Sequence, residues 1–129
     1  MAIDETALAG PADFTAEVRD EMGATVVTLA GEIDFSGAGA LREVFVLPEV
    51  LTAPAVRVDL TGVEYLGSPG IGVIVSACKR IRGSGGTFSV ICGQNEPWRI
   101  LEACGLLEYL DVEGDSDSQQ SHFASHQEQ

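Results

Sequence analysis

One serine lies where a strand is predicted to end and a helix to begin. The stretch "YLGSPGIGV" (residues 65–73) surrounds Ser68 with glycine and proline, just before the apolar run "IGVIVSACKRI". A hydroxyl at such a position could cap the helix, act as a nucleophile, help to hold a phosphate, or accept one as a modification. The residue types around Ser68 separate these four roles.

Capping is the structural explanation for Ser68. The residue before a proline avoids helical backbone angles, and an N-cap residue must also have non-helical angles. A proline suits the first helical position, because the N–H that it lacks would have no partner there. The pattern therefore predicts that Ser68 is the N-cap and Pro69 the first residue of a helix that runs to about Arg82. An N-cap contributes about 1 kcal/mol and leaves its side chain accessible for a second role.

A nucleophilic role lacks a base. The two histidines of the chain, His122 and His126, lie in a polar C-terminal segment, and the G-x-S-x-G pattern of a nucleophile elbow is absent. The same absence argues against a cysteine hydrolase that uses Cys104. Two histidines four residues apart could hold a metal on a helix, but in a polar segment we expect solvated side chains. We predict neither an enzyme nor a metal site.

A phosphate cradle is a weaker possibility. "GSPGIG" follows a predicted strand and precedes a helix, but it matches neither G-x-G-x-x-G nor the G-K-[ST] of a P-loop. The first N–H groups of the helix and its dipole could still hold an anion weakly. A small nucleotide- or ligand-binding protein therefore stays open as an alternative function, and we predict no cofactor.

Length and charge exclude several classes of protein. The 129 residues fit one domain, and the net charge of −13 disfavours nucleic acid as a partner, because phosphate binding needs clustered positive charge. The chain has no apolar run near the roughly 20 residues that span a bilayer, and its N-terminus does not resemble a signal peptide. We therefore expect no membrane association and a cytoplasmic location. The three cysteines are widely spaced, and we expect buried side chains rather than disulfides.

Hydrophobic periodicity predicts alternating strands and helices between residues 14 and 112. Residues 1–13 are expected to be a flexible segment, and the polar, serine- and glutamine-rich residues 113–129 a disordered tail. Ser36 is a candidate N-cap for the first helix, which Pro48 should end or interrupt. The expected strands are 14–22, 24–33, 55–60, 87–92 and 107–112, and the expected helices are 36–51, 68–82 and 96–104, with Gly105 just past the end of the last helix.

The second predicted helix has the clearest pattern. Its apolar residues recur on one face, which should pack against the sheet, and the glycines of "GSGG" should end it. The residues of this face are Ile71, Ile74, Val75, Cys78 and Ile81. Strands that alternate with helices imply parallel neighbours in a sheet.

Two segments resemble one protein family. "LAGEIDFSGAGALR" (residues 29–42) looks like the "l-x-G-e-l-D" segment of STAS domains, the fold of bacterial anti-sigma factor antagonists. "VRVDLTGVEYLGSPGIGVIVSACKRIRGSGGTFSVI" (residues 56–91) resembles the segment "v-v-l-D-l-s-x-v-x-f-i-D-S-[ST]-G-l-G-v-L" of that family, in the same order and spacing. The resemblance implies a single α/β STAS-like domain at residues 14–112, with a mixed four- to five-stranded sheet and helices mainly on one face.

The resemblance also implies a function. In such antagonists, an anti-sigma factor that is also a serine kinase phosphorylates the motif serine, and the unphosphorylated antagonist binds that factor and releases the sigma factor. Ser68 matches the phosphorylated position, Asp34 matches an acidic residue near it, and Asp59 matches the aspartate of the central strand. The implied partner is an anti-sigma factor with serine kinase activity.

This sequence departs from the family pattern on both sides of the serine. Gly67 replaces the motif aspartate, and Pro69 replaces the serine or threonine that follows. A STAS scaffold in a signalling assembly that works without phosphorylation is therefore an alternative. In either case we expect the partner to bind the Ser68 turn and the exposed side of its helix, at Asp34, Gly67, Pro69, Gly70, Gly72, Ser76 and Lys79.

Overall fold

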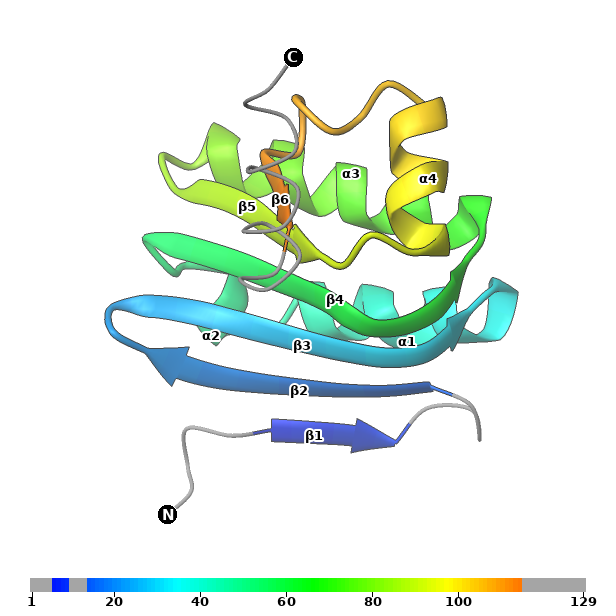
Figure 1. Cartoon of the computed structure of the whole chain (residues 1–129). Helices are drawn as coiled ribbons and strands as arrows, with labels where there is room; N and C mark the ends of the chain where they lie inside the picture. The colour runs from blue at the N-terminus through cyan, green and yellow to red at the C-terminus, as the bar shows by residue number, and fades with distance from the viewer. Residues whose placement is uncertain (1–5, 10–13, 115–129) are drawn as a thin grey trace.

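A computed structural model describes residues 6–9 and 14–114 of the chain. In these residues, one mixed sheet lies against helices (Figure 1). The strands are β1 (Thr6–Ala9), β2 (Phe14–Glu21), β3 (Ala24–Ile33), β4 (Ala55–Leu66), β5 (Thr87–Cys92) and β6 (Val112–Gly114). The helices are α1 (Phe35–Phe45), α2 (Pro48–Leu51), α3 (Ser68–Gly83) and α4 (Glu96–Ala103).

The sheet follows the order of the chain, from β1 to β6. β1, β2 and β3 pair antiparallel, whereas β3, β4, β5 and β6 pair parallel. Parallel neighbours need a crossover connection, which α1 with α2, α3 and α4 supply in turn. α1, α2 and α3 lie on one face of the sheet (Figure 1). The predicted α/β class with a mixed sheet is confirmed, and β1, within the segment 1–13 expected to be flexible, brings the described strands to six.

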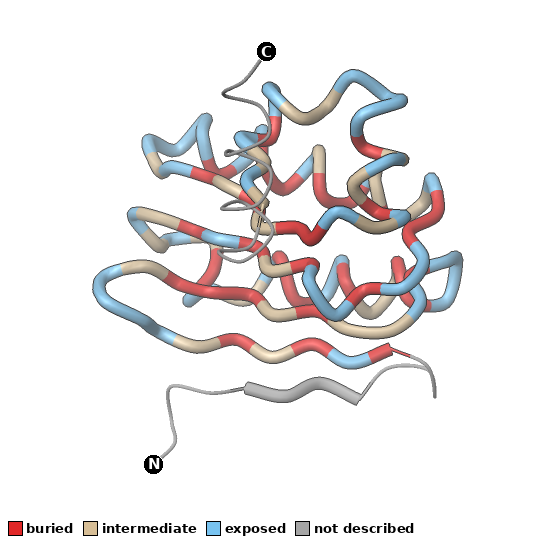
Figure 2. The backbone as a smooth tube through the Cα atoms, viewed as in Figure 1, coloured by how far each residue is buried: buried red, intermediate tan, exposed pale blue. Residues whose placement is uncertain are grey.

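The β2–β3 hairpin shows how local sequence fixes one edge of the fold. Met22 and Gly23 connect the strands with φ of 50° and 85°, a two-residue turn whose twist matches that of the strands. Along β2, buried Phe14, Ala16 and Val18 alternate with more exposed residues (Figure 2). The predicted pairing of these two strands is confirmed.

α3 buries a wider face than its sequence pattern indicates. Ile74, Cys78 and Ile81 are fully buried, while Ile71 and Val75 are half-buried against the core. The sequence pattern missed two further buried residues, Val73 and Ala77. α3 packs against α1 as well as against β4 and β5, so two sides of the helix are covered.

The C-terminal part of the domain differs from the prediction. Residues 107–111, expected to begin a strand, form a turn in which Asp111 has a φ of 55° and Val112 N–H donates to the carbonyl of Leu107 (2.9 Å). The last strand, β6, pairs Glu113 with Ile91 of β5. Residues 113 and 114 therefore belong to the sheet and not to the tail predicted at 113–129, and the rest of that segment lies outside the described residues.

The cysteines only partly match the expectation. Cys78 and Cys92 are buried, as predicted, but Cys104 is exposed at the end of α4. Burial raises the pKa of the Cys78 thiol, although the nearby charge of Arg82 opposes this shift. Cys78 therefore packs as a neutral side chain in the core.

Replacing Ile74 with alanine tests the packing of α3. Ile74 has no exposed surface, so we expect Ile74→Ala to lower the free energy of unfolding by about 2–5 kcal/mol, from lost burial and the cavity it leaves. Chemical denaturation measures this change. Ser76→Ala is the matched control, because Ser76 is exposed on the same helix. Equal stability of Ile74→Ala and wild-type protein would contradict the packing.

Candidate functional site

The structure brings Asp34 and Ser68 to one edge of the sheet. β3 and β4 run parallel, and their last residues, Ile33 and Leu66, are register partners. Gly67 N–H donates to the carbonyl of Ile33 (2.9 Å), which ties the two strand ends together. Asp34 follows β3 directly and Ser68 opens α3, so the two exposed side chains belong to neighbouring turns.

The predicted capping role of Ser68 is wrong. Gly67 is the N-cap of α3, with extended backbone angles (φ −89°, ψ 170°), and its carbonyl accepts the N–H of Ile71 (3.1 Å). Ser68 is already the first helical residue. Within residues 14–114, the Ser68 hydroxyl makes no hydrogen bond. The helix begins one residue early because the bond to Ile33 holds Gly67 extended, and the Ser68 side chain faces solvent without a capping role.

The start of α1 is shifted in the same direction. Asp34, not Ser36, is its N-cap, and the carbonyl of Asp34 accepts the N–H of Ala38 (2.8 Å). The Asp34 carboxylate makes no capping hydrogen bond in the described structure. This acidic side chain is therefore exposed beside the Ser68 turn.

Two glycines of the expected partner-binding set are buried. A Cβ atom on Gly70 would lie 2.6 Å from Cγ2 of Ile33 and 3.0 Å from Cδ1 of Leu66. A Cβ atom on Gly67 would lie 3.2 Å from the hydroxyl oxygen of Tyr65. These glycines let α3 begin close against β3. They can shape the surface that a partner meets, but a partner cannot reach them freely.

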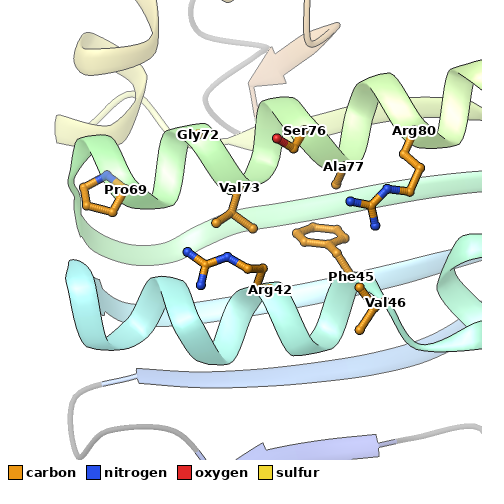
Figure 3. A pocket seen from close by; sticks show the side chains of 9 residues that line it. All are labelled: Arg42, Phe45, Val46, Pro69, Gly72, Val73, Ser76, Ala77 and Arg80. Atoms are coloured by element: carbon orange, nitrogen blue, oxygen red, sulfur yellow. The ribbon is translucent and has the colours of Figure 1, made fainter.

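The remaining expected positions on α3 are accessible. Gly72, Ser76 and Lys79 are exposed, and Pro69 is half-buried. An open groove of about 370 Å³ runs between α1 and α3 (Figure 3). It is lined by Arg42, Phe45 and Val46 from α1 and its C-cap, and by Pro69, Gly72, Val73, Ser76, Ala77 and Arg80 from α3.

A large exposed aromatic residue that was not predicted from the sequence lies at this site. Phe35 is the first residue of α1, follows Asp34, and is 83% exposed. An exposed side chain of this size is a common anchor for a protein partner. The available signal was an apolar residue between Asp34 and Ser36, at a position where a helix begins.

Asp59 has a structural role within β4. Its carboxylate accepts hydrogen bonds from the N–H (2.9 Å) and the hydroxyl (2.7 Å) of Thr61. The register with β3 shifts at this point, between Thr28 and Ala30. Asp59 therefore stabilises a bulge in the central strand and lies apart from the Ser68 turn.

Neither a metal-ligating cluster nor a membrane-spanning helix is present among the described residues. Residues 14–114 hold no cluster of three metal-ligating side chains, and His122 and His126 lie outside the described range. Among the helices of the described chain, each is too short or too polar to cross a membrane. What the site offers is an exposed hydroxyl, an exposed acid, an exposed aromatic ring and a groove with two arginines.

Two glycines in the first turn of α3 provide a matched test of this geometry. Gly70→Ala should lower the free energy of unfolding by about 1–3 kcal/mol, because the added methyl group overlaps Ile33. Gly72→Ala meets no atom within 4 Å and should be neutral or stabilise by up to about 1 kcal/mol. Denaturant unfolding compares the two variants. The same effect from both would contradict the close contact at Gly70.

The chain matches known proteins over most of its length. The family model described as "STAS domain" matches residues 13–119. An anti-sigma-B factor antagonist of Bacillus subtilis is 29% identical over 105 residues, which cover 81% of this chain and 95% of that protein. The anti-sigma-F factor antagonist RsfB of Mycobacterium tuberculosis is 30% identical over 99 residues, 77% of this chain and 80% of that one. The crystal structure of an anti-sigma factor antagonist from Mycobacterium paratuberculosis superposes with a TM-score of 0.75 at 28% identity, over 89% of this chain and 97% of that chain.

Proposed function

The chain belongs to the STAS domain family, and we propose that it is an anti-sigma factor antagonist. In this proposal it binds an anti-sigma factor with serine kinase activity, and phosphorylation of Ser68 ends the binding. The relatives named as antagonists of anti-sigma-B and anti-sigma-F factors support the class of partner. The proposal includes a cytoplasmic location, because sigma factors act on transcription there.

The observation that carries the switch is the exposed hydroxyl of Ser68 at the first position of α3. The Ser68 hydroxyl is exposed and makes no hydrogen bond in the described structure, so its modification breaks no internal hydrogen bond. A kinase could reach it without unfolding the domain. Gly67 and Gly70 keep the turn close to the sheet and place the hydroxyl at the edge where Asp34 is also exposed.

The charge of a phosphate would act mainly on the partner. Phosphorylation adds up to about two negative charges at Ser68. The positive end of the α3 dipole favours that charge within the domain. Fewer N–H groups are available than the sequence suggests, because Pro69 has none and Ile71 N–H already bonds to Gly67. In a bound complex, the phosphate would bring repulsion and a desolvation cost to the contact, which favours dissociation.

The unswitched scaffold is the second candidate function. Gly67 and Pro69 replace the motif residues on both sides of Ser68, and Pro69 removes one backbone donor beside the phosphate position. A STAS domain with these changes could bind its partner constitutively. Mapping of phosphate on Ser68 separates the two functions.

Ser68→Asp and Ser68→Ala test the switch. We expect Ser68→Asp to weaken binding to the anti-sigma factor at least tenfold, since it places charge in the contact, and Ser68→Ala to retain most of the binding (order of magnitude from). Titration calorimetry measures both. Because Ser68 is not the cap, we expect both variants to unfold within about 1 kcal/mol of the wild-type protein.

The phosphorylation itself is measured separately. The chain is incubated with the purified anti-sigma factor and ATP, and phosphate is located by mass spectrometry, with Ser68→Ala as the control. Phosphate on another residue, or binding that ignores Ser68→Asp, would reject the switch. Strong binding without phosphate on Ser68 would support the scaffold instead.

Phe35→Ala tests whether the exposed ring anchors the partner. Loss of a central aromatic anchor should weaken binding by about 2 kcal/mol, which is close to thirtyfold. The stability of the free domain should change little, because Phe35 is 83% exposed. Met22→Ala is the matched control, since Met22 is 99% exposed in the hairpin turn away from Asp34. Equal affinity of the Phe35 and Met22 variants would exclude this anchor.

A further inference from the structure

We propose that the groove between α1 and α3 receives an acidic, amphipathic segment of the anti-sigma factor, held by Arg42 and Arg80. This inference rests on the function proposed above and adds the chemistry of the partner. The groove is a surface beyond the Ser68 turn.

The floor of the groove is apolar. Phe45, Val73 and Ala77 line it from the two helices and are nearly fully buried in the domain, with only small parts of their side chains at the groove surface. Val46 lies at the edge of the groove and is 51% exposed. An apolar face of another chain could bury Val46 and exclude water from the floor, which is a favourable change in free energy.

Two positively charged side chains lie above the apolar floor of the groove. The side chains of Arg42 and Arg80 extend over the groove from opposite helices (Figure 3). In the part of the chain that the structure describes, neither guanidinium group forms an ion pair or a hydrogen bond. By contrast, Arg19 pairs with Glu21 and the Arg82 guanidinium donates to the carbonyl of Tyr109. A guanidinium group binds a carboxylate through two parallel hydrogen bonds.

The surrounding charge makes these arginines selective. The chain has 20 acidic and only 7 basic residues, so positive charge that could bind an acidic partner is scarce. The groove combines two of the seven basic residues with an apolar floor. An acidic segment with one apolar face complements this combination, whereas a basic segment would meet repulsion at both arginines.

The groove continues from the Ser68 turn. Pro69, the residue after Ser68, and Gly72 line the groove, and Arg80 lines it further along α3. The twelve residues from Pro69 to Arg80 span roughly 16 Å along the helix axis, the length of about three helical turns. A partner that contacts Ser68 can therefore place one short helix along the groove.

Charge reversal of the two arginines tests this assignment. Arg42→Glu combined with Arg80→Glu should weaken binding to the purified anti-sigma factor at least tenfold, order of magnitude from, and the loss should be larger at low salt. The control is Arg57→Glu combined with Arg99→Glu, two exposed arginines of β4 and α4 that do not line the groove and that give the same change in net charge. The control should change affinity by less than about threefold.

The outcomes separate this inference from the proposed function. Suppose that Ser68→Asp weakens binding but that the charge reversal at Arg42 and Arg80 lowers the affinity no more than the control variant does. The groove assignment is then wrong and the proposed function stands. If the wild-type chain binds none of the purified anti-sigma factors of its own organism, both fail.

Two other occupants of the groove are tested with the same variants. If the wild-type chain is a dimer in sedimentation and the groove variant a monomer, a second copy occupies the groove and the inference is overturned. If truncation after Gly114 strengthens binding and abolishes the effect of groove reversal, the acidic C-terminal segment of this chain is the occupant, which also overturns it.

Discussion

The contact between the end of β3 and the start of α3 sets the geometry of the whole candidate site. The hydrogen bond from Gly67 N–H to the Ile33 carbonyl holds the turn against the sheet, and the missing side chain of Gly70 lets α3 pass within van der Waals contact of Ile33. Because both turns follow parallel strands, this contact also places Asp34 beside the turn that carries Ser68. A larger residue at position 70 would push the helix away and separate the two.

The same arrangement creates the groove. α1 and α3 each follow a strand of the parallel part of the sheet and pack on the same face of the sheet. The two helices therefore run side by side, and the groove lies between them. The groove is lined by exposed residues of the two helices and by the edges of core residues such as Val73 and Ala77. The packing of α1 against α3 thus forms both the core and the groove, which explains why Val73 and Ala77 are buried and yet border the groove.

Charge is divided over this face of the molecule. The Ser68 turn has an exposed acid, Asp34, and a hydroxyl that can gain negative charge, whereas the groove has the two arginines. A partner that binds both the Ser68 turn and the groove would need two features. It would place an acidic segment in the groove, and the part of its surface that contacts Ser68 would accept the serine only without a phosphate. In the proposed mechanism, phosphorylation would oppose binding at one end of the face while the groove contact stays unchanged, so the switch would lower affinity without changing the fold.

The sequence by itself determined the α/β class, the β2–β3 hairpin, the apolar face of α3 and the positions of Ser68 and Asp34, because periodicity, turn residues and the STAS motifs are local patterns. It did not determine the helix caps, which lie at Gly67 and Asp34 and not at Ser68 and Ser36. At Gly67, a hydrogen bond to the carbonyl of Ile33, 34 residues earlier in the chain, holds the backbone extended. Residues 107–111 form a turn closed by local hydrogen bonds such as that from Val112 N–H to the Leu107 carbonyl, and Val90 N–H of β5 and the Arg82 guanidinium donate to carbonyls of this turn. The exposure of Phe35 and the meeting of Arg42 with Arg80 also needed the tertiary structure, because helix packing alone decides which side chains share a surface.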